Sequence, residues 1–471
     1  MIHLRPYQTA SVNGVRDSFK LGGRAPLLVA PTGAGKTVIF SYIAQNAAAK
    51  KLRVLIMAHR LELCEQCGDK LTQNGVPFGY ISPNYTPDYT RSVQVGTIQT
   101  INSRKAKIPF TPDLIIIDEA HRSLANTYRT ILQYYPKAKI LGVTATPIRG
   151  DGKSLGALYD DMIIGPTVSE LIELGFLVQP KTYGSSVPLD LSNVSIDHKT
   201  GDYKKTELKK LVDKPLIIGD AVEHYRKICD KVPAVAFCVD IDSSMKVAEE
   251  FRKAGYICEH IDGNMDKTER SAILRRLAAG ETHVLTSVDL ITEGFDAPMV
   301  QCAIMLRPTQ STGLYIQMAG RALRPFPGKK FAYILDHVNN TGHWRGTTFF
   351  PKHGFIDQDR EWELDGHKKR NGKITETSIA IRQCPECFGI HKPAPACPYC
   401  GLAYIATPGG RNIEAQDGEL MELTAQHKAR TAKREQQQAR ELKDLVALGQ
   451  SRGYAPGWAD RVFAARKKVN R

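Results

Sequence analysis

The stretch LLVAPTGAGKT, residues 27–37, decides the fold of this chain. An apolar run, Leu27-Leu28-Val29, leads into a loop with two glycines. Such a loop between a strand and a helix points backbone N–H groups at phosphates, and the helix N-terminus adds positive partial charge. Lys36 would reach the β- and γ-phosphates, and the Thr37 hydroxyl would hold Mg²⁺. We predict that a nucleoside triphosphate binds here, at Pro31, Thr32, Gly33, Ala34, Gly35, Lys36 and Thr37.

An acidic motif supports this interpretation. Asp118-Glu119-Ala120-His121 directly follows a second apolar run, residues 114–117. Asp118 is a natural direct or water-mediated carboxylate for Mg²⁺, and Glu119 is a candidate for polarising the attacking water. The strict loop pattern has glycine where this chain has Ala30, which is tolerated if the loop opens like a strand end. A lone glycine-rich turn is often an ordinary tight turn, but the acidic motif behind its own strand argues against that alternative.

Strands and helices alternate through residues 1–180, as a mostly parallel sheet requires. Polar residues end each apolar run, and ligands bind at the carboxyl edge of open α/β sheets. A short helix within residues 166–180 is expected to leave this domain, and the polar residues 181–215 are interpreted as a connector or insertion. The expected strands are 27–30, 54–58, 93–96, 114–118 and 140–144.

A second α/β domain is expected over residues 216–345. It has no phosphate-binding loop of its own, so the two sheets would hold one nucleotide between them. Residues 346–380 are charged and irregular, which indicates a linker; 381–405 contain a cysteine cluster, and 406–471 a helical basic tail. The expected strands are 234–239, 257–261, 283–286, 303–306 and 331–336.

Length and charge restrict the class of protein. A chain of 471 residues suggests two or three domains. It has no run of 18 apolar residues and no signal-peptide pattern at its start, so we expect a cytoplasmic protein with no membrane partner. The net charge of +15 favours a polyanionic partner, although many basic proteins bind no nucleic acid.

Further motifs then fit one family. Leu4-Arg5-Pro6-Tyr7-Gln8 precedes the phosphate loop, and Gln317-Met318-Ala319-Gly320-Arg321-Ala322-Leu323-Arg324-Pro325 lies in the second domain. Four further motifs lie between these two, at residues 58–60, 96–100, 143–147 and 286–298. Over residues 3–340 these motifs closely resemble superfamily 2 helicases of the DEAD/DEAH type. The boxes at 295–298, 306–309 and 334–337 are similar to the RadD-like, phage-type DNA helicases related to type III restriction helicase subunits. The resemblance implies two tandem RecA-like domains and a protein that acts in a bacterial or phage-infected cell.

The resemblance also assigns ATP contacts. Gln8 would hydrogen-bond adenine and Arg5 would pack beside the base, although both residues also suit a helix start. Arg321 and Arg324 are arginine-finger candidates that would face the γ-phosphate together with Gln317. The spacing from Gln317 predicts one helical face for all three, and a solvated basic face is the alternative. Gly294 and Asp296 are the remaining candidate nucleotide contacts.

Nucleic-acid contacts and coupling residues follow from the same resemblance. His121, Thr144 and Thr146 resemble the elements that couple ATP hydrolysis to nucleic acid. Small residues and hydroxyls suit phosphate contacts that do not read bases, although ordinary loop chemistry also explains each of them. The candidate contacts are Arg60, Gly96, Thr97, Gln99, Thr100, Gly263 and Thr286.

The cysteine cluster consists of two C-x-x-C pairs, which suit tetrahedral Zn²⁺. Its gap is shorter than in the usual zinc-ribbon spacing, so a compact structural ribbon is predicted, with redox chemistry or chance as alternatives. Disulfides do not persist in the cytoplasm, and so small a module would depend on metal to fold. The four candidate ligands are Cys384, Cys387, Cys397 and Cys400.

Together these features predict an ATP-dependent DNA helicase or translocase acting in recombination, repair or phage replication. Its cofactors would be ATP, Mg²⁺ and Zn²⁺. Its partners would be single-stranded, duplex or branched DNA, with single-strand-binding or recombination proteins. An RNA helicase, the motor subunit of a restriction complex and a non-catalytic DNA-binding adaptor are the alternatives. The tail around Trp458, Val462 and Phe463 would bind DNA or a partner, or pack on the motor.

Overall fold

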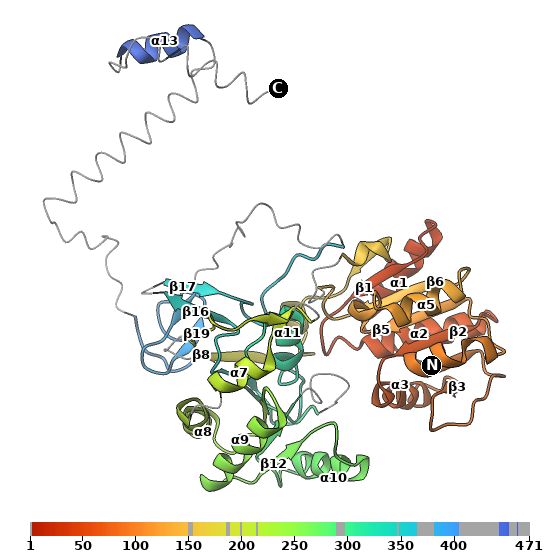
Figure 1. The fold of residues 1–471 in the computed structure, drawn as a ribbon, viewed down its shortest axis with the longest axis horizontal. Helices are drawn as coiled ribbons and strands as arrows, with labels where there is room; N and C mark the ends of the chain where they lie inside the picture. Colours follow the sequence, from red (N-terminus) through yellow and green to blue (C-terminus); the bar gives the residue numbers. More distant parts are fainter. Residues whose placement is uncertain are drawn as a thin grey trace, which may run out of the picture. The chain divides into compact units, whose positions relative to one another are not determined.

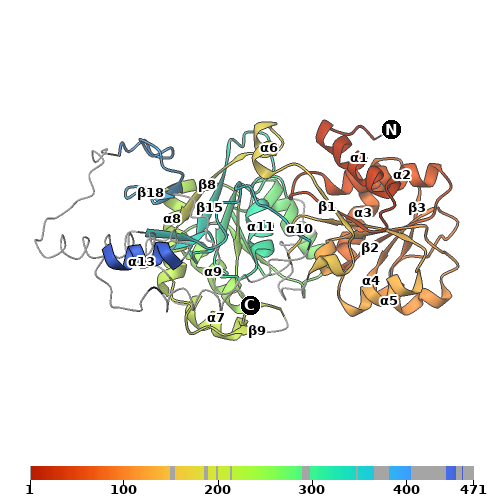
Figure 2. The ribbon, with the colours of Figure 1, turned by 90° about the horizontal axis from the view of Figure 1, so that it is seen from above.

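The computed structural model describes residues 2–148, 154–184, 189–197, 200–212, 215–288, 297–345, 348–364, 381–404, 442–451 and 459. Residues 2–404 belong to one compact unit, which contains two α/β lobes (Figures 1 and 2). Gly294, Asp296, Trp458, Val462 and Phe463 lie outside the described residues.

The first lobe, residues 2–178, contains a seven-stranded sheet in the order β3-β4-β2-β5-β6-β1-β7, and every strand pair is parallel. Its strands are β1 Pro26–Val29, β2 Val54–Ala58, β3 Phe78–Ile81, β4 Val93–Thr97, β5 Leu114–Asp118, β6 Lys139–Thr144 and β7 Asp161–Ile164. Five of them confirm the expected strands. β3 and β7 were missed because they are short, four-residue edge strands that are only partly buried.

Successive strand residues of this lobe face opposite layers. Leu28 and Ile116 pack under the first three helices, whereas Leu27 and Ile115 pack under the next two. This alternation follows from the two-residue period of a strand, and it buries both faces of a parallel sheet. The helices are α1 Pro6–Lys20, α2 Lys36–Ala49 and α3 Leu61–Gln73 on one face, and α4 Ile98–Arg104 and α5 Asn126–Tyr134 on the other (Figure 2).

The second lobe contains an eight-stranded sheet in the order β12-β13-β11-β14-β15-β8-β19-β18. Helices cover both of its faces. The strands expected here are confirmed: β11 Ala234–Phe237, β12 Cys258–Ile261, β13 Val284–Ser287, β14 Cys302–Met305 and β15 Phe331–Asp336. The helices are α8 Pro215–Cys229, α9 Ile241–Lys253, α10 Lys267–Ala278 and α11 Thr312–Gly320.

Two segments interpreted as irregular contain structure. β8, Gln179–Gly184, follows α6, Val168–Glu173, and pairs in parallel with β15, so the second sheet begins before the connector was expected. At the start of the expected linker, β17 Thr348–Pro351 pairs antiparallel with β16 Gly342–Arg345, which ends the expected second domain. Pairing with segments distant in sequence stabilises β8, and its own polar composition gave no such signal.

The connector contains a small insertion, here defined as residues 189–197 and 200–212. It consists of an antiparallel pair, β9 Ile196–Asp197 with β10 Asp202–Tyr203, followed by α7, Lys205–Val212. Leu208 and Val212 of α7 enter the buried cluster that also contains residues of α8 and α9. The insertion is therefore part of the second lobe.

The cysteine module extends the second sheet. β18, Arg382–Gln383, pairs with β19, Gly389–His391, and β19 pairs antiparallel with β8. The Tyr399 hydroxyl donates to the Ile390 carbonyl at 2.9 Å and accepts from the Thr182 N–H at 3.3 Å. The module is thus bonded to the lobe through backbone and side chain.

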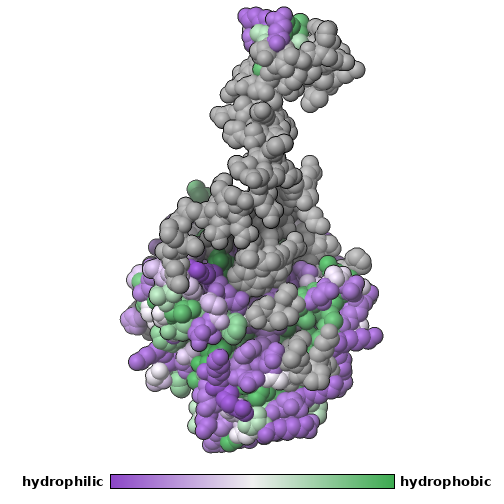
Figure 3. All heavy atoms as spheres, turned by 90° about the vertical axis from the view of Figure 1, so that its left-hand side faces the viewer, coloured by the Kyte–Doolittle hydropathy of each residue, from purple (hydrophilic) through white to green (hydrophobic). Residues whose placement is uncertain are grey.

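A second unit comprises residues 405–471, of which the described part is α13, Leu442–Ser451, together with residue 459. No helix among the described residues has the length and hydropathy needed to cross a membrane. On the face drawn in Figure 3, hydrophilic side chains predominate and hydrophobic ones are scattered among them.

Candidate functional site

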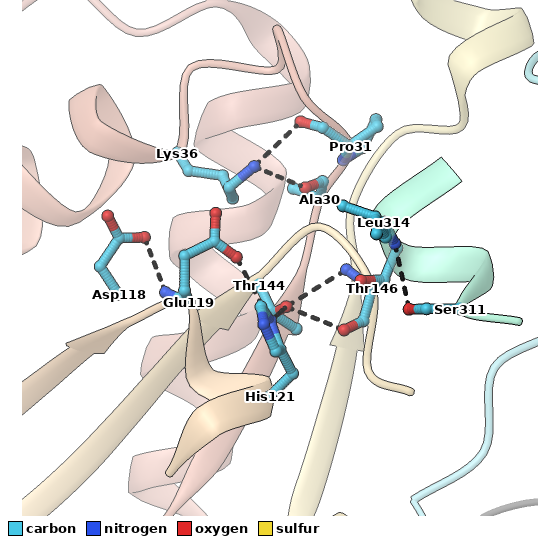
Figure 4. Close-up of polar contacts among 10 residues, drawn as sticks. All are labelled: Ala30, Pro31, Lys36, Asp118, Glu119, His121, Thr144, Thr146, Ser311 and Leu314. Atoms are coloured by element: carbon cyan, nitrogen blue, oxygen red, sulfur yellow. Dashed lines mark hydrogen bonds and ion pairs between the residues drawn. The ribbon is translucent and has the colours of Figure 1, made fainter. Parts of the chain in front are cut away.

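The loop between β1 and α2 has the backbone of a phosphate site. Gly33 and Gly35 have φ of +90° and +76°, a region in which side chains are disfavoured. Ala30 extends the strand instead, because its N–H donates to the Thr144 carbonyl at 2.9 Å, and this agrees with the expectation of a strand end. The Lys36 ammonium donates back to the carbonyls of Ala30 at 3.2 Å and Pro31 at 3.4 Å (Figure 4).

Charges around Lys36 come from both lobes. Burial lowers the pKa of Lys36, the Glu119 and Asp118 carboxylates oppose that shift, and the positive charges of Arg321 and Arg324 add to it. A lysine surrounded in this way has an ammonium that a polyphosphate would stabilise further. The positive charges of Arg321 and Arg324 therefore act on Lys36 from the other lobe.

Gln8 and Arg5 lie beside the loop. The Gln8 side chain is buried, accepts from the Arg5 N–H at 3.0 Å and donates to the Ala34 carbonyl at 3.1 Å. A Cβ on Gly35 would come within 2.6 Å of the Gln8 amide nitrogen, so this close approach requires glycine. The Arg5 guanidinium lies 3.7 Å from the centre of the Phe176 ring, whose edge also meets Tyr7. Phe176 was not found from the sequence, because it lies far from Arg5 in a short apolar stretch.

The acidic motif lies at the end of β5. Glu119 has φ +51°, and its N–H donates to Asp118 Oδ1 at 3.0 Å. This left-handed conformation turns the chain into a short 3₁₀ turn, Ala120–Arg122. Burial and the Glu119 charge raise the pKa of Asp118 to about 6, against the opposing effect of Lys36. Crowded carboxylates next to a phosphate loop suit Mg²⁺, which Thr37 and Asp118 would hold.

A chain of contacts leads from Glu119 to the edge of the first lobe. His121 Nδ1 lies 3.3 Å from Glu119 Oε2 and 3.2 Å from Thr144 Oγ1. The Thr144 hydroxyl donates to the Thr146 carbonyl at 2.9 Å and accepts from the Thr146 N–H at 3.2 Å (Figure 4). The three residues predicted to couple hydrolysis are therefore connected to the predicted hydrolytic carboxylate.

Helix α11 of the second lobe meets this edge through two glycines. A Cβ on Gly313 would lie 2.9 Å from Thr146 Oγ1, and one on Gly320 would lie 3.3 Å from Thr32 Cβ. The two glycines are seven residues apart in the sequence, so they lie on the same side of α11. Glycine at both therefore allows the helix to approach the phosphate loop and Thr146 closely.

The prediction that Gln317, Arg321 and Arg324 share one helical face is wrong. α11 ends at Gly320, Arg321 is its C-cap, and Arg324 lies in the following turn. In this turn the backbone N–H groups donate to carbonyls three residues earlier in the chain. The distance from the Arg321 N–H to the Met318 carbonyl is 3.3 Å. Pro325 disfavours helical geometry at Arg324, the residue before it, so the helix does not extend through Arg324.

Lys329 was not predicted and holds this turn in place. It is buried, and its ammonium donates to the carbonyls of Pro298 at 3.1 Å, Val300 at 2.6 Å and Arg324 at 2.6 Å. One side chain thereby connects the loop before β14 to the loop that carries an arginine-finger candidate. Lys329 is one of two adjacent lysines, and nothing in the sequence around it indicates this role.

The predicted nucleic-acid contacts differ in exposure. Arg60 is the N-cap of α3 and lines a cleft between the lobes, and Gln99 and Gly263 are exposed. The hydroxyls of the buried Thr97 and Thr100 bond to each other at 2.8 Å. The buried residues also include Gly96 and Thr286, whose hydroxyl donates to the Glu259 carbonyl at 3.4 Å. The roles of all seven residues remain predictions.

The four cysteines fit a tetrahedral metal ion. Their sulfurs all lie within 4.8 Å of one another, with Cys384 Sγ 3.6 Å from Cys400 Sγ and Cys387 Sγ 3.7 Å from Cys397 Sγ. A tetrahedron with Zn–S bonds of about 2.3 Å requires sulfur separations of about 3.8 Å. Burial by itself raises the pKa of Cys384. Hydrogen bonds from the N–H groups of Cys387 and residue 386 outweigh this effect and lower the pKa to about 6. The residues present fit Zn²⁺.

Comparison with known proteins decides the family. The family described as "Type III restriction enzyme, res subunit" matches residues 1–149, and the "Helicase conserved C-terminal domain" matches residues 221–325. A 51.5 kDa protein of a Lactococcus phage is 33% identical over 365 residues, which cover 77% of this chain and 74% of that protein. The chain belongs to the superfamily 2 helicases related to restriction helicase subunits.

Two further comparisons place this helicase. An ATP-dependent helicase of Saccharomyces cerevisiae, IRC3, is 30% identical over 355 residues, covering 71% of this chain and 51% of that protein. Among solved structures, a fragment described as an HsdR subunit of a type I restriction enzyme from Vibrio vulnificus has a TM-score of 0.56 at 24% identity. It covers 72% of this helicase and 65% of that chain, and it supports the fold of two RecA-like lobes.

Proposed function

We propose that this helicase is an ATP-dependent DNA translocase that remodels DNA in recombination, repair or phage replication. The observation that carries the proposal is the chain of polar contacts from Glu119 through His121 and Thr144 to Thr146, which ends against α11 of the other lobe. Hydrolysis at one end of this chain would change the contact between lobes at the other end.

The residues of this site would divide the reaction between the lobes. The loop N–H groups and Lys36 would bind the phosphates, and Glu119 would orient the attacking water. Thr37 and Asp118 would hold Mg²⁺, which neutralises charge on the phosphate oxygens when bound. Arg321 and Arg324 would reach the γ-phosphate from the second lobe and stabilise the charge that develops during transfer.

DNA is proposed as the track because the matched family carries the name of a restriction enzyme, a class that acts on DNA. The same name makes the motor subunit of a restriction complex the second candidate function. An RNA helicase would use the same motor. The net charge of +15 supports binding to either polyanion.

The test is steady-state ATPase at one fixed salt concentration, without nucleic acid and with single-stranded DNA, duplex DNA, forked DNA or RNA. Stimulation by DNA alone is the expected result, and the best substrate would indicate which DNA structure is remodelled. Stimulation by RNA alone would replace the proposal with an RNA motor. Absence of hydrolysis with every substrate would contradict a self-sufficient motor.

A further inference from the structure

The cleft between the lobes, of about 640 Å³, has one wall that was not predicted. Arg60, His121 and Thr146 of the first lobe line one side, and Gln317 of the second lobe also lines it. The insertion supplies the remaining wall through Lys204, Lys205 and Thr206, none of which the sequence analysis selected. The insertion therefore lies at the place where the coupling residues reach the surface.

An acidic side chain anchors the insertion to the second lobe. Asp202 Oδ2 accepts from the Thr309 hydroxyl at 2.7 Å, and Asp202 Oδ1 accepts from the Gln310 N–H at 2.7 Å. Thr309 is itself held, because its N–H donates to Asn340 Oδ1 at 3.0 Å and its carbonyl lies 3.0 Å from His353 Nε2. The anchor is thus a fixed point of the lobe.

The aromatic residue next to the anchor is structural. Tyr203 is 9% exposed, and Lys352 lies over its ring at 5.0 Å, with the ammonium 3.4 Å from the hydroxyl. The adjacent Lys204 and Lys205 are exposed, and the Lys204 ammonium lies 3.7 Å from the Glu207 carboxylate. Anchor and tyrosine together direct the following two lysines into the cleft.

The side chains that line the cleft indicate which kind of ligand it would bind. Among the described residues that line the cleft, amine, guanidinium and hydroxyl groups dominate, and Ile148 and Leu314 are the only aliphatic side chains. Such donors bind the sugar-phosphate backbone and do not read bases. Five basic residues line the cleft against two acidic ones, of which Asp202 is engaged in the anchor: Arg60, Arg122, Lys204, Lys205 and Arg307 against Asp197 and Asp202.

We propose that the insertion forms one wall of the nucleic-acid path, with Lys204 and Lys205 binding phosphates and Asp202 acting as the positioning residue. This inference rests on the proposed function, since it concerns the strand that the motor follows. A strand in the cleft would touch His121, which is only partly buried and lies 3.3 Å from Glu119, and so its presence would be transmitted to Glu119.

The first experiment measures the affinity of the full chain for a fluorescein-labelled oligo(dT) at several salt concentrations. Each phosphate contact on a single strand contributes about 0.7 to the slope of log K against log salt. Lys204→Ala with Lys205→Ala should therefore lower the slope by about 1.4 and weaken binding roughly 25-fold at 0.1 M salt. Replacement of both by arginine should restore the slope.

A matched control lies on the same helix. Lys210 is exposed and does not line the cleft. Lys210→Ala removes one positive charge at a neighbouring position, as each substitution of the double variant does, and it should bind DNA as the wild type does. If the double variant and Lys210→Ala have equal slopes, the inference is overturned while the DNA motor stands. If the wild-type chain binds neither DNA nor RNA, the proposed function itself fails.

The second experiment asks whether Asp202→Ala tightens or weakens DNA binding. Asp202→Ala removes a negative charge from the cleft, so charge alone would tighten DNA binding. Loss of the anchor would release the two lysines and weaken binding, and weakening of at least fivefold is the expected result. Tighter binding, or a raised KM for ATP with unchanged DNA affinity, would overturn the assignment of this wall to nucleic acid.

Discussion

At the scale of single residues, Lys36 shows how the site is prepared for its ligand. Its ammonium is bonded to two carbonyls of its own loop, and two carboxylates lie near enough to affect its pKa. Phosphate oxygens would replace the carbonyls at little cost in geometry, because the loop already has the backbone that its glycines permit.

We expect Lys36→Ala to reduce ATP hydrolysis at least 100-fold, since removal of one preorganised donor lowers turnover by about 10²–10³. Salt-sensitive DNA binding should remain, because Lys36 does not line the cleft. Phosphate release and fluorescence anisotropy would measure the two properties. Lys50→Ala, exposed at the other end of α2, is the control, and near-normal hydrolysis by Lys36→Ala would remove the phosphate-loop assignment.

Arg324 is expected to act on turnover. Arg324→Ala should lower kcat by about 10³-fold or more with little change in ATP affinity, as for an arginine finger. Hydrolysis kinetics together with equilibrium binding of a non-hydrolysable nucleotide would separate the two effects. Arg275→Ala, in an exposed position on α10, should leave both unchanged. An unaltered kcat would exclude Arg324 as the finger.

At the scale of elements, the turn after α11 depends on Lys329. Lys329→Met would leave three carbonyls without their shared donor, each at a cost of about 1–3 kcal/mol. We expect kcat to fall because Arg324 loses its support, with KM for ATP less affected. Lys330→Met is the adjacent control, and kinetics with a thermal unfolding curve would check both. A stable variant with normal kcat would contradict the positioning role.

The cysteine module should depend on metal. Wild-type protein should contain one zinc per chain, and Cys397→Ser should release it, because a three-sulfur site binds zinc weakly. Elemental analysis would measure the metal, and limited proteolysis would detect exposure of the β8 edge that β19 covers. Cys258→Ala, in β12, should retain zinc. A folded, metal-free wild type would show that the four cysteines serve another purpose.

At the scale of the whole motor, a segment after the β16–β17 hairpin joins the lobes. At one end His353 lies 3.0 Å from the Thr309 carbonyl of the second lobe. At the other end the Leu364 carbonyl accepts from the Ser154 hydroxyl at 2.8 Å in the first. Between them, the half-buried Trp362 packs against the buried clusters of both lobes. This strap, residues 352–364, lies in the region interpreted from the sequence as a linker.

Trp362→Ala should therefore lower the free energy of unfolding by about 2 kcal/mol, less than the 3–5 kcal/mol typical of a fully buried tryptophan. Because the contact is shared, we expect the unfolding transitions of the two lobes to separate in calorimetry. Phe326→Ala removes an exposed aromatic residue and is the control. Unchanged transitions would show that the strap does not couple the lobes.

The sequence by itself determined the two mostly parallel sheets, the phosphate loop, the acidic motif and the cysteine pairs. These features are local: continuous apolar runs, loop glycines and short ligand spacings are visible within a few residues. Tertiary structure alone decided the rest. β8, the Asp202 anchor, the Lys329 clamp and the Phe176 contact each join segments far apart in the chain, and their polar or solitary residues resemble ordinary surface until the fold brings the partners together.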